Sequence, residues 1–351
     1  MKIIIDAMSG DYAPNAQVEG AILARKELGV DVVLTGHPAV LERCLRERGA
    51  AQDSGITVVP AMEIIDMHDD PSTAVRRKKD SSMAVALNLL RDGEGDAVVS
   101  AGNTGALLTG ATLLVKRIRG VRRACMAPVL PNGGSGALLI DCGANVDCTS
   151  EYLMQFAYMG SFYAQRMLGV DSPRVGLLNN GAEDTKGGAL QREVYALLRQ
   201  AGEAGRINFV GNIEGSDIFS GKAEVIVTDG FSGNVVLKTI EGTAKFLMKN
   251  LKGALTSSPK AKLGALLVKD SLSGLKKMLD VSEVGGTPFL GIQKPVIKAH
   301  GSSDARAIRS AARQAADFAA SGFIADVERN AEYMRLRTEE TGNNNGNNKE
   351  D

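Results

Sequence analysis

The sequence predicts an α/β fold in which a mostly parallel β-sheet is covered by helices and carries one antiparallel hairpin. Short apolar runs rich in β-branched residues alternate with stretches of helical length, which is the pattern of successive β-α-β units. Several of these runs end abruptly in turns that carry glycine and asparagine. Residues 126–130 and 136–140 flank a Pro-Asn-Gly-Gly turn at 131–134, which indicates the hairpin.

The N-terminal region contains predicted strands at residues 2–6, 30–35 and 56–59. Helices expected at about residues 15–28 and 39–48 connect them. Because each connection is long enough to hold a crossover helix, the strands are expected to be parallel and buried on both faces.

A polar segment with four consecutive basic residues, at 76–79, follows the third strand. Such a run is usually a solvated helix face. Here it precedes Asp80-Ser81-Ser82, a good N-cap sequence for a helix at 83–90. Since a helix N-terminus and cations both favour an anion, we expect Lys78 and Lys79 to contribute to an anion site.

Polar turns follow five apolar strands that end at residues 100, 140, 178, 210 and 228. In an open parallel sheet such strand ends lie at the same edge, where ligands bind, so we expect these turns to line one crevice. The turns contain neither the dinucleotide fingerprint nor a P-loop. Their candidate substrate-binding residues are Asn103, Thr104, Gly105, Asn145, Asn179, Asn212, Gly230, Ser232, Gly233 and Asn234.

Residues 224–238 contain the last of these strand ends and read as a buried strand, a tight polar loop and a helix. The helix that follows directs its free backbone N–H groups toward whatever binds in the loop. Asp229 stands at the strand end beside Gly230, which leaves its carboxylate uncrowded.

The composition excludes several classes of protein. Lys plus Arg and Asp plus Glu are both 41, aromatic residues are 4%, and Trp is absent, which argues against nucleic acid as a partner. The four cysteines lack the paired spacing of metal ligands, so we expect reduced thiols and no metal site. The apolar run at residues 3–5 is too short for a signal peptide or a membrane span.

Residues 243–282 form a predicted basic, amphipathic helical hairpin that is broken near residues 257–259. Such a hairpin packs on its own core or a second subunit, or it contacts a membrane surface, and the pattern leaves both open. We expect residues 1–340 to form a single α/β catalytic domain and the Asn- and Gly-rich tail at 341–351 to be disordered.

Six motifs in this order resemble the PlsX family of bacterial acyl-[acyl-carrier-protein]:phosphate acyltransferases over residues 2 to about 320. The motifs are residues 6–11 (DAMSGD), 78–83 (KKDSSM), 100–106 (SAGNTGA), 210–215 (VGNIEG), 228–234 (TDGFSGN) and 299–303 (AHGSS). Two departures are visible: Ser9 replaces a usual glycine, and Asn-Gly-Ala at 180–182 replaces the more usual Ile-Gly-Glu.

The resemblance implies a Rossmann-like three-layer α/β/α fold related to phosphotransacetylase and isopropylmalate dehydrogenase. It implies a cytoplasmic homodimer held loosely at the inner face of the cell membrane. It also implies the reaction of an acyl-carrier-protein thioester with inorganic phosphate to give acyl phosphate, an early step toward phosphatidic acid. No cofactor is expected, because the carrier brings its own phosphopantetheine. The downstream glycerol-3-phosphate acyltransferase is a candidate partner.

This reaction suits the sequence because phosphate is itself the nucleophile, so the protein needs an anion cradle and an oxyanion stabiliser. We expect phosphate among the amides of residues 103–105 and 232–234, with Lys78, Lys79 or Lys186 as the cation. Asp229 or Asp141 orients or deprotonates it, with Asp229 preferred.

His300 is the candidate for the thioester carbonyl or the leaving sulfur, although a lone His beside serines more often serves a helix-entry hydrogen bond. Two alternatives to the acyl-carrier-protein:phosphate acyltransferase hypothesis remain. One is a phosphotransacetylase that acts on acyl-CoA, and the other is a non-catalytic scaffold for lipid enzymes at the membrane surface.

Overall fold

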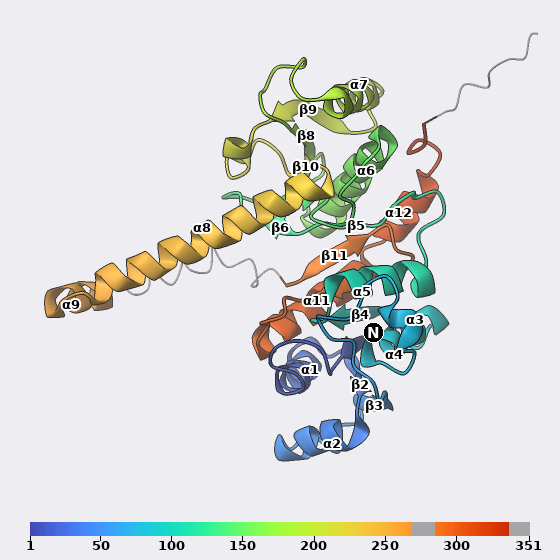
Figure 1. Ribbon diagram of the computed structural model, residues 1–351, viewed down its shortest axis with the longest axis vertical. Coiled ribbons are helices and arrows are strands. Elements are labelled where there is room, and N and C mark those ends of the chain that lie inside the picture. The colour runs from blue at the N-terminus through green and yellow to red at the C-terminus, as the bar shows by residue number, and fades with distance from the viewer. Residues whose placement is uncertain (269–284, 337–351) are drawn as a thin grey trace, which may run out of the picture.

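A computed structural model describes residues 1–268 and 285–336 of the chain. Within these residues the strands form two sheets, each mostly parallel. Figure 1 shows two lobes, one built from the ends of the chain and one from its middle, with helix α8 projecting away from both. The α/β fold class is confirmed, but the parallel strands that we expected in one sheet are divided between two.

The first sheet has seven strands among the described residues, and its first five in spatial order are mutually parallel. The last two strands are antiparallel to their neighbours. The spatial order is β3 (Ile56–Pro60), β2 (Asp31–Gly36), β1 (Lys2–Asp6), β4 (Ala97–Ser100), β12 (Val296–Lys298), β11 (Thr287–Leu290) and β5 (Cys125–Met126).

The second sheet has five strands within the described part of the chain, and its β6–β7 pair is the predicted antiparallel hairpin. The other strands are parallel. The spatial order is β6 (Val129–Leu130), β7 (Ala137–Ile140), β10 (Val225–Val227), β8 (Arg174–Leu178) and β9 (Asn208–Ile213).

One expected turn lies inside a strand. The polar turn that we placed after Val210 is part of β9, which continues through Gly211 and Asn212 to Ile213. The register of β9 on β8 shifts at this point, since Phe209 pairs with Val175 and Gly211 with Gly176. Val210 is therefore an extra residue in a β-bulge, and the bulge lets the Gly-Asn sequence stay in the ladder.

Both faces of the first sheet are buried because its strands are apolar at successive positions. Ile3 and Ile5 pack with helices α1 (Asn15–Leu28) and α11 (Ala305–Ala320), whereas Ile4 packs with the opposite core of α4 (Ser82–Asp92). The smaller helical elements of this lobe are α2 (Pro38–Glu47), α3 (Ala74–Arg77), α5 (Thr104–Gly110) and the π-helical turn η1 (Ala111–Val115). The last helix, α12 (Phe323–Arg329), packs against α6 (Ser150–Met167).

The second sheet is covered on one face by α6 (Ser150–Met167), with α7 (Ala189–Glu203) packed at its edge strand β9. The first turns of α8 (Gly230–Thr256) cover the other face, where Leu237 joins the core. A single 3₁₀ turn, η2 (Gly215–Asp217), follows β9.

Helix α8 leaves the body of the protein, and α9 (Pro259–Leu267) lies at its far end (Figure 1). The break between them falls at residues 257–258, as the sequence predicts. Residues 269–282 of the expected hairpin and the tail at 341–351 lie outside the described residues.

The space around two helix glycines, one packed against β10 and one open, predicts opposite effects for their replacement by alanine. An added Cβ at Gly160 would lie 2.4 Å from Val225 Cγ1, whereas one at Gly242 in α8 meets nothing within 4 Å. Gly160→Ala is expected to lower the free energy of unfolding by about 1–3 kcal/mol through overpacking. Gly242→Ala is expected to raise it by about 0.5–1 kcal/mol, because alanine favours a helix. Urea denaturation followed by circular dichroism measures both changes. A change in the free energy of unfolding of the same sign in both variants would contradict the packing described.

Candidate active site

Three polar side chains form a row at the carboxyl ends of neighbouring strands in the first sheet. Asp6, Ser100 and Lys298 are the last residues of β1, β4 and β12, and they pair in register across the sheet. Residues paired in this way on parallel strands point to the same face. Ser100 Oγ donates to Asp6 Oδ2 at 2.7 Å. We call Asp6, Ser100 and Lys298 the strand-end row.

Asp6 is completely buried, and its Oδ1 has no hydrogen-bond partner within the described residues. A buried polar atom without a partner is costly, so it calls for an explanation such as a bound group. Asp6 begins the first of the six motifs, but it is not among the predicted site residues, because its position is that of the polar end of an apolar strand.

Lys298 is half-buried and lines a cavity beside the strand-end row. Its Nζ donates to the carbonyl oxygen of Ala299. Burial disfavours the charged ammonium and lowers the pKa of Lys298 to about 8, against a smaller opposing effect from Asp6. Lys298 therefore titrates near physiological pH, unlike an ordinary lysine.

His300 faces the same cavity, two residues beyond Lys298. The backbone N–H of Ser302 donates to His300 Nδ1 at 3.2 Å, and Ser302 Oγ lies 2.8 Å from the same nitrogen. Because Nδ1 accepts from an amide, the proton of the neutral imidazole is on Nε2. Desolvation, followed by the positive charge of Lys298, lowers the pKa of His300, so the ring is neutral at pH 7.

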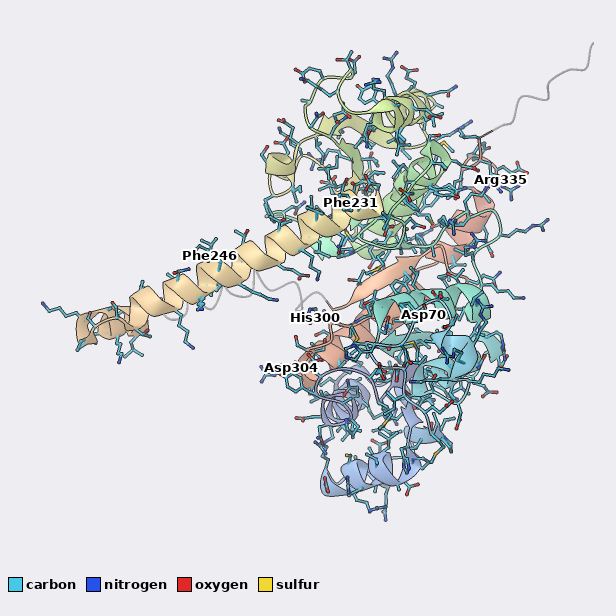
Figure 2. All side chains as sticks on the ribbon, viewed as in Figure 1. Asp70, Phe231, Phe246, His300, Asp304 and Arg335 are labelled. Carbon is cyan, nitrogen blue, oxygen red and sulfur yellow. The ribbon has the colours of Figure 1, made fainter. Side chains whose placement is uncertain are left out.

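The cavity has a volume of about 1020 Å³ and lies between α8 and the first lobe. Its polar wall carries Thr104, Lys298 and the segment around His300 and Asp304 (Figure 2). The opposite wall is formed by the β5–β6 segment and by successive turns of α8, and most of its side chains are apolar, although Lys238, Glu241 and Lys245 of α8 also line it. These apolar residues are Met126, Pro128, Val129, Leu237, Ile240, Ala244 and Met248.

Of the predicted site residues in the first lobe, Thr104 and His300 line this cavity. Asn103 caps α5 through a 3.1 Å bond from Ala106 N and also donates to the carbonyl oxygens of Asp66 and Asp69. Gly105 lies against Pro71, where a Cβ would approach to 2.7 Å. These residues hold the 66–71 loop against the start of α5.

The predicted cation Lys78 is not free to bind an anion. Its Nζ lies 2.5 Å from Asp69 Oδ2 and donates to the carbonyl oxygen of Ile64 at 2.9 Å. The hydrogen bond to Asp69 raises the pKa of Lys78. Neither Lys78 nor Lys79 lines the cavity. Ser81, rather than these lysines, contacts the N-terminus of α4, since its Oγ accepts from Ala84 N.

Asp141 and Asp229 have structural contacts in the second lobe. Asp141 is fully buried and accepts hydrogen bonds from Met126 N, Ala144 N, Asn145 N and Asn145 Nδ2. Burial raises the pKa of Asp141. Asp229 caps α8, because it accepts from Ser232 N at 2.8 Å and from Ser232 Oγ at 2.9 Å.

The glycines at the start of α8 bring these two loops together. Gly230 N donates to the carbonyl oxygen of Asn145 at 2.8 Å. A Cβ at Gly233 would lie 1.9 Å from the carbonyl oxygen of Asp141, and Asn234 faces Gly143. Asp141, Asn145 and residues 229–234 thus form one compact loop cluster, which does not line the cavity.

A third group of predicted residues lies at the ends of β8 and β9. Asn179 Nδ2 donates to Asn212 Oδ1 at 3.1 Å and to the carbonyl oxygen of Lys186. Lys186 itself is exposed, with Nζ 3.8 Å from Glu183 Oε2. The structure therefore divides the predicted site residues into separate groups, and their roles in catalysis stay predictions.

The comparison with solved structures shows the fold. The fold is similar to that of a phosphotransacetylase from Streptococcus pyogenes, with a TM-score of 0.61, 18% identity and coverage of 91% of this chain and 94% of that one. The two sheets are thus arranged as in the fold of this phosphotransacetylase.

The sequence comparisons identify the family. The model of the family described as "Fatty acid synthesis protein" matches residues 1–326. The phosphate acyltransferase of Oceanobacillus iheyensis is 49% identical over 316 residues, which cover 90% of this chain and 92% of that protein. That of Thermoanaerobacterium thermosaccharolyticum is 44% identical over 334 residues, covering 95% and 98%. The chain belongs to this family, the PlsX phosphate acyltransferases, and is an acyltransferase of lipid synthesis.

The described residues contain no cluster of three or more His, Cys, Asp or Glu side chains that is arranged to hold a metal ion. Across residues 1–268 and 285–336, no helix combines the length and the apolar character needed to cross a membrane.

The hydrogen bonds of Asp141 and Asp229 predict unequal losses of stability. Asp141→Ala leaves several buried donors unpaired, so we expect the free energy of unfolding to fall by about 3 kcal/mol or more. Asp229→Ala removes one helix N-cap and should cost about 1 kcal/mol. Urea denaturation of both variants measures the difference, and a larger loss for Asp229→Ala would contradict the assignment of Asp141 as the organiser of the loop cluster.

Proposed function

We propose that this acyltransferase converts an acyl-carrier-protein thioester and inorganic phosphate into acyl phosphate and free carrier protein. The observation that supports it best is the cavity, which joins an apolar wall to a polar wall bearing Lys298 and His300. An acyl chain needs the first wall, and a phosphate and a polarised thioester need the second.

The reaction needs no external acid or base in its overall balance. A phosphate oxygen attacks the thioester carbonyl carbon, a C–O bond forms, and the C–S bond breaks. The hydrogen phosphate dianion gives up one proton, and the leaving thiolate gains one. The protein therefore has to align the two substrates, stabilise the negative charge that develops on the carbonyl oxygen, and allow this proton to pass.

His300 is suited to the carbonyl oxygen. Because His300 Nδ1 accepts a hydrogen bond from the backbone N–H of Ser302, the imidazole has Nε2–H free to donate. The lowered pKa of His300 keeps the ring neutral. A neutral donor stabilises an oxyanion without attracting the phosphate itself. The lobe that carries Asp229 and Lys186 is proposed to supply further contacts to phosphate or carrier, from groups outside the cavity lining.

The identity of the thioester and the role of His300 are tested by one assay series. Purified protein with phosphate should form acyl phosphate from acyl-carrier protein and much less from acyl-CoA. His300→Ala should lower kcat by about 10²–10³-fold, as loss of an oxyanion donor does, and His300→Gln should restore part of it. His68→Ala, at an exposed position away from the cavity, is the matched control.

Preference for acyl-CoA would instead support a phosphotransacetylase, the reaction named for the structural relative. Unchanged kcat in His300→Ala would exclude the oxyanion role. Membership of a family of acyltransferases argues against the other alternative, a scaffold without catalytic activity.

We further propose a cytoplasmic homodimer that contacts the membrane surface through the projecting helices. Beyond the cavity α8 is largely exposed, and its Phe246 and Leu247 are 66% and 54% exposed (Figure 2). In α9 the leucines at 263, 266 and 267 are 63%, 67% and 81% exposed. Exposed apolar side chains among lysines fit a second subunit near the body and an anionic lipid surface at the tip. A glycerol-3-phosphate acyltransferase at that membrane is a candidate recipient of the product.

The membrane contact predicts a loss of vesicle binding on changing the tip of α9. Replacing both Leu266 and Leu267 with Glu should weaken cosedimentation with anionic phospholipid vesicles by at least about tenfold, since burying two leucines contributes several kcal/mol. Leu113→Glu, at an exposed leucine on η1, should leave binding unchanged. Unaltered sedimentation of the double variant would favour a subunit contact for α9.

A further inference from the structure

Lys298 is a cation whose burial the fold does not explain. Of the atoms in the described residues, the carbonyl oxygen of Ala299 is its hydrogen-bond acceptor, and no carboxylate lies within ion-pair distance of Nζ. An ammonium group has three N–H donors. Two donors therefore remain for a group that enters the cavity, which Lys298 lines.

Charged groups of both signs surround Lys298. Asp6 on β1 and Asp11 in the following loop raise its pKa, whereas burial and Lys238 of α8 lower it, and His300 faces it from its own segment. Lys238 is itself paired with Glu241 at 2.9 Å. The other predicted cations are elsewhere, since Lys78 is bound to Asp69 and Lys186 lies outside the cavity lining.

The strand-end row fixes the position of this cation. Ser100 Oγ donates a hydrogen bond to Asp6 Oδ2. Both residues are paired in register with neighbouring strands, whose backbone cannot shift without breaking the hydrogen bonds of the sheet. A lysine on a strand end is held more rigidly than one on a loop, which suits a group that must align a nucleophile.

We propose that Lys298 binds the phosphate that attacks the thioester, with Asp6 and Ser100 as its positioning residues. This assignment rests on the proposed function and names the residue that holds its nucleophile. Lys298 remains an ammonium ion throughout: it offsets the charge of the phosphate and takes no proton from it. The proton released from phosphate passes to the leaving sulfur, as in the overall balance.

The test measures phosphate binding separately from turnover. The unfolding temperature of the full-length wild-type protein should rise with inorganic phosphate and not with chloride at the same ionic strength, because a ligand of the folded state stabilises it. Lys298→Met should weaken phosphate binding by about 10–100-fold, the value of a charge-assisted hydrogen bond. Lys294→Met is the matched control, because Lys294 Nζ donates to the carbonyl oxygen of Leu90 and lies outside the cavity.

The pH dependence separates a binding role from a merely structural one. Phosphate has lost its second proton by pH 8. A fall in phosphate affinity above that pH therefore reflects the titration of a group on the protein. Because the pKa of Lys298 is about 8, wild-type affinity should fall as pH rises past 8. Lys298→Arg should keep its affinity there, since arginine stays charged. Asp6→Asn removes a charge that raises this pKa, so the midpoint should move to lower pH.

The outcomes are distinguishable. Phosphate binding that depends on Lys298, without acyl phosphate formation from acyl-carrier protein, would contradict the proposed function and support the role of Lys298. Acyl phosphate formation with a phosphate KM that is unchanged in Lys298→Met would overturn the inference alone. Absence of a phosphate-dependent rise in the wild-type unfolding temperature, or a fall in the affinity of Lys298→Arg above pH 8, would also overturn it.

Discussion

Burial of the first sheet on both faces is the constraint on which the rest of the site depends. Ile3, Ile4 and Ile5 are all fully buried, in two different cores, so β1 has no solvated face for a polar side chain. In this strand a polar side chain can therefore be placed only at an end. The in-register pairing of β1, β4 and β12 then makes the ends coincide and sets Asp6, Ser100 and Lys298 side by side.

Helix α8 connects the regions that the proposed reaction needs. Its N-terminus is capped by Asp229 inside the loop cluster, and Leu237 belongs to the core of the second sheet. Further along, Ile240, Ala244 and Met248 recur at helical spacing and form the apolar wall of the cavity. Its last turns are exposed and lead to α9 (Figure 1). An acyl chain that followed this wall would run from the strand-end row toward the projecting end of the helix.

Features encoded in short segments could be predicted from the sequence, whereas features that depend on strand pairing could not. The hairpin, the strand at 296–298 and the break in the basic helices each have a local signal, and the structure confirms them. The division into two sheets depends on which strands pair. The β-bulge at Val210 depends on the register of β9 against β8. A Gly-Asn sequence has the same local preference for a turn whether it follows a strand or lies within one. The pairing of β9 with β8 therefore determines that residues 211–212 are part of the strand.

The two lysines show why charge density along the chain is a poor guide to an anion site. Lys78 belongs to the densest basic run in the sequence, yet its ammonium is neutralised by Asp69, because a flexible cation near solvent readily finds a carboxylate. Lys298 follows two apolar residues and has the sequence pattern of an ordinary strand end, but folding buries much of its side chain, and no carboxylate of residues 1–268 or 285–336 pairs with it. The electrostatic attraction that remains for a ligand is larger for the second lysine, since desolvation strengthens the interaction and no partner has yet compensated the charge. That difference arises only when β12 pairs with β4 across about two hundred residues of sequence, so it is a property of the fold and not of the segment.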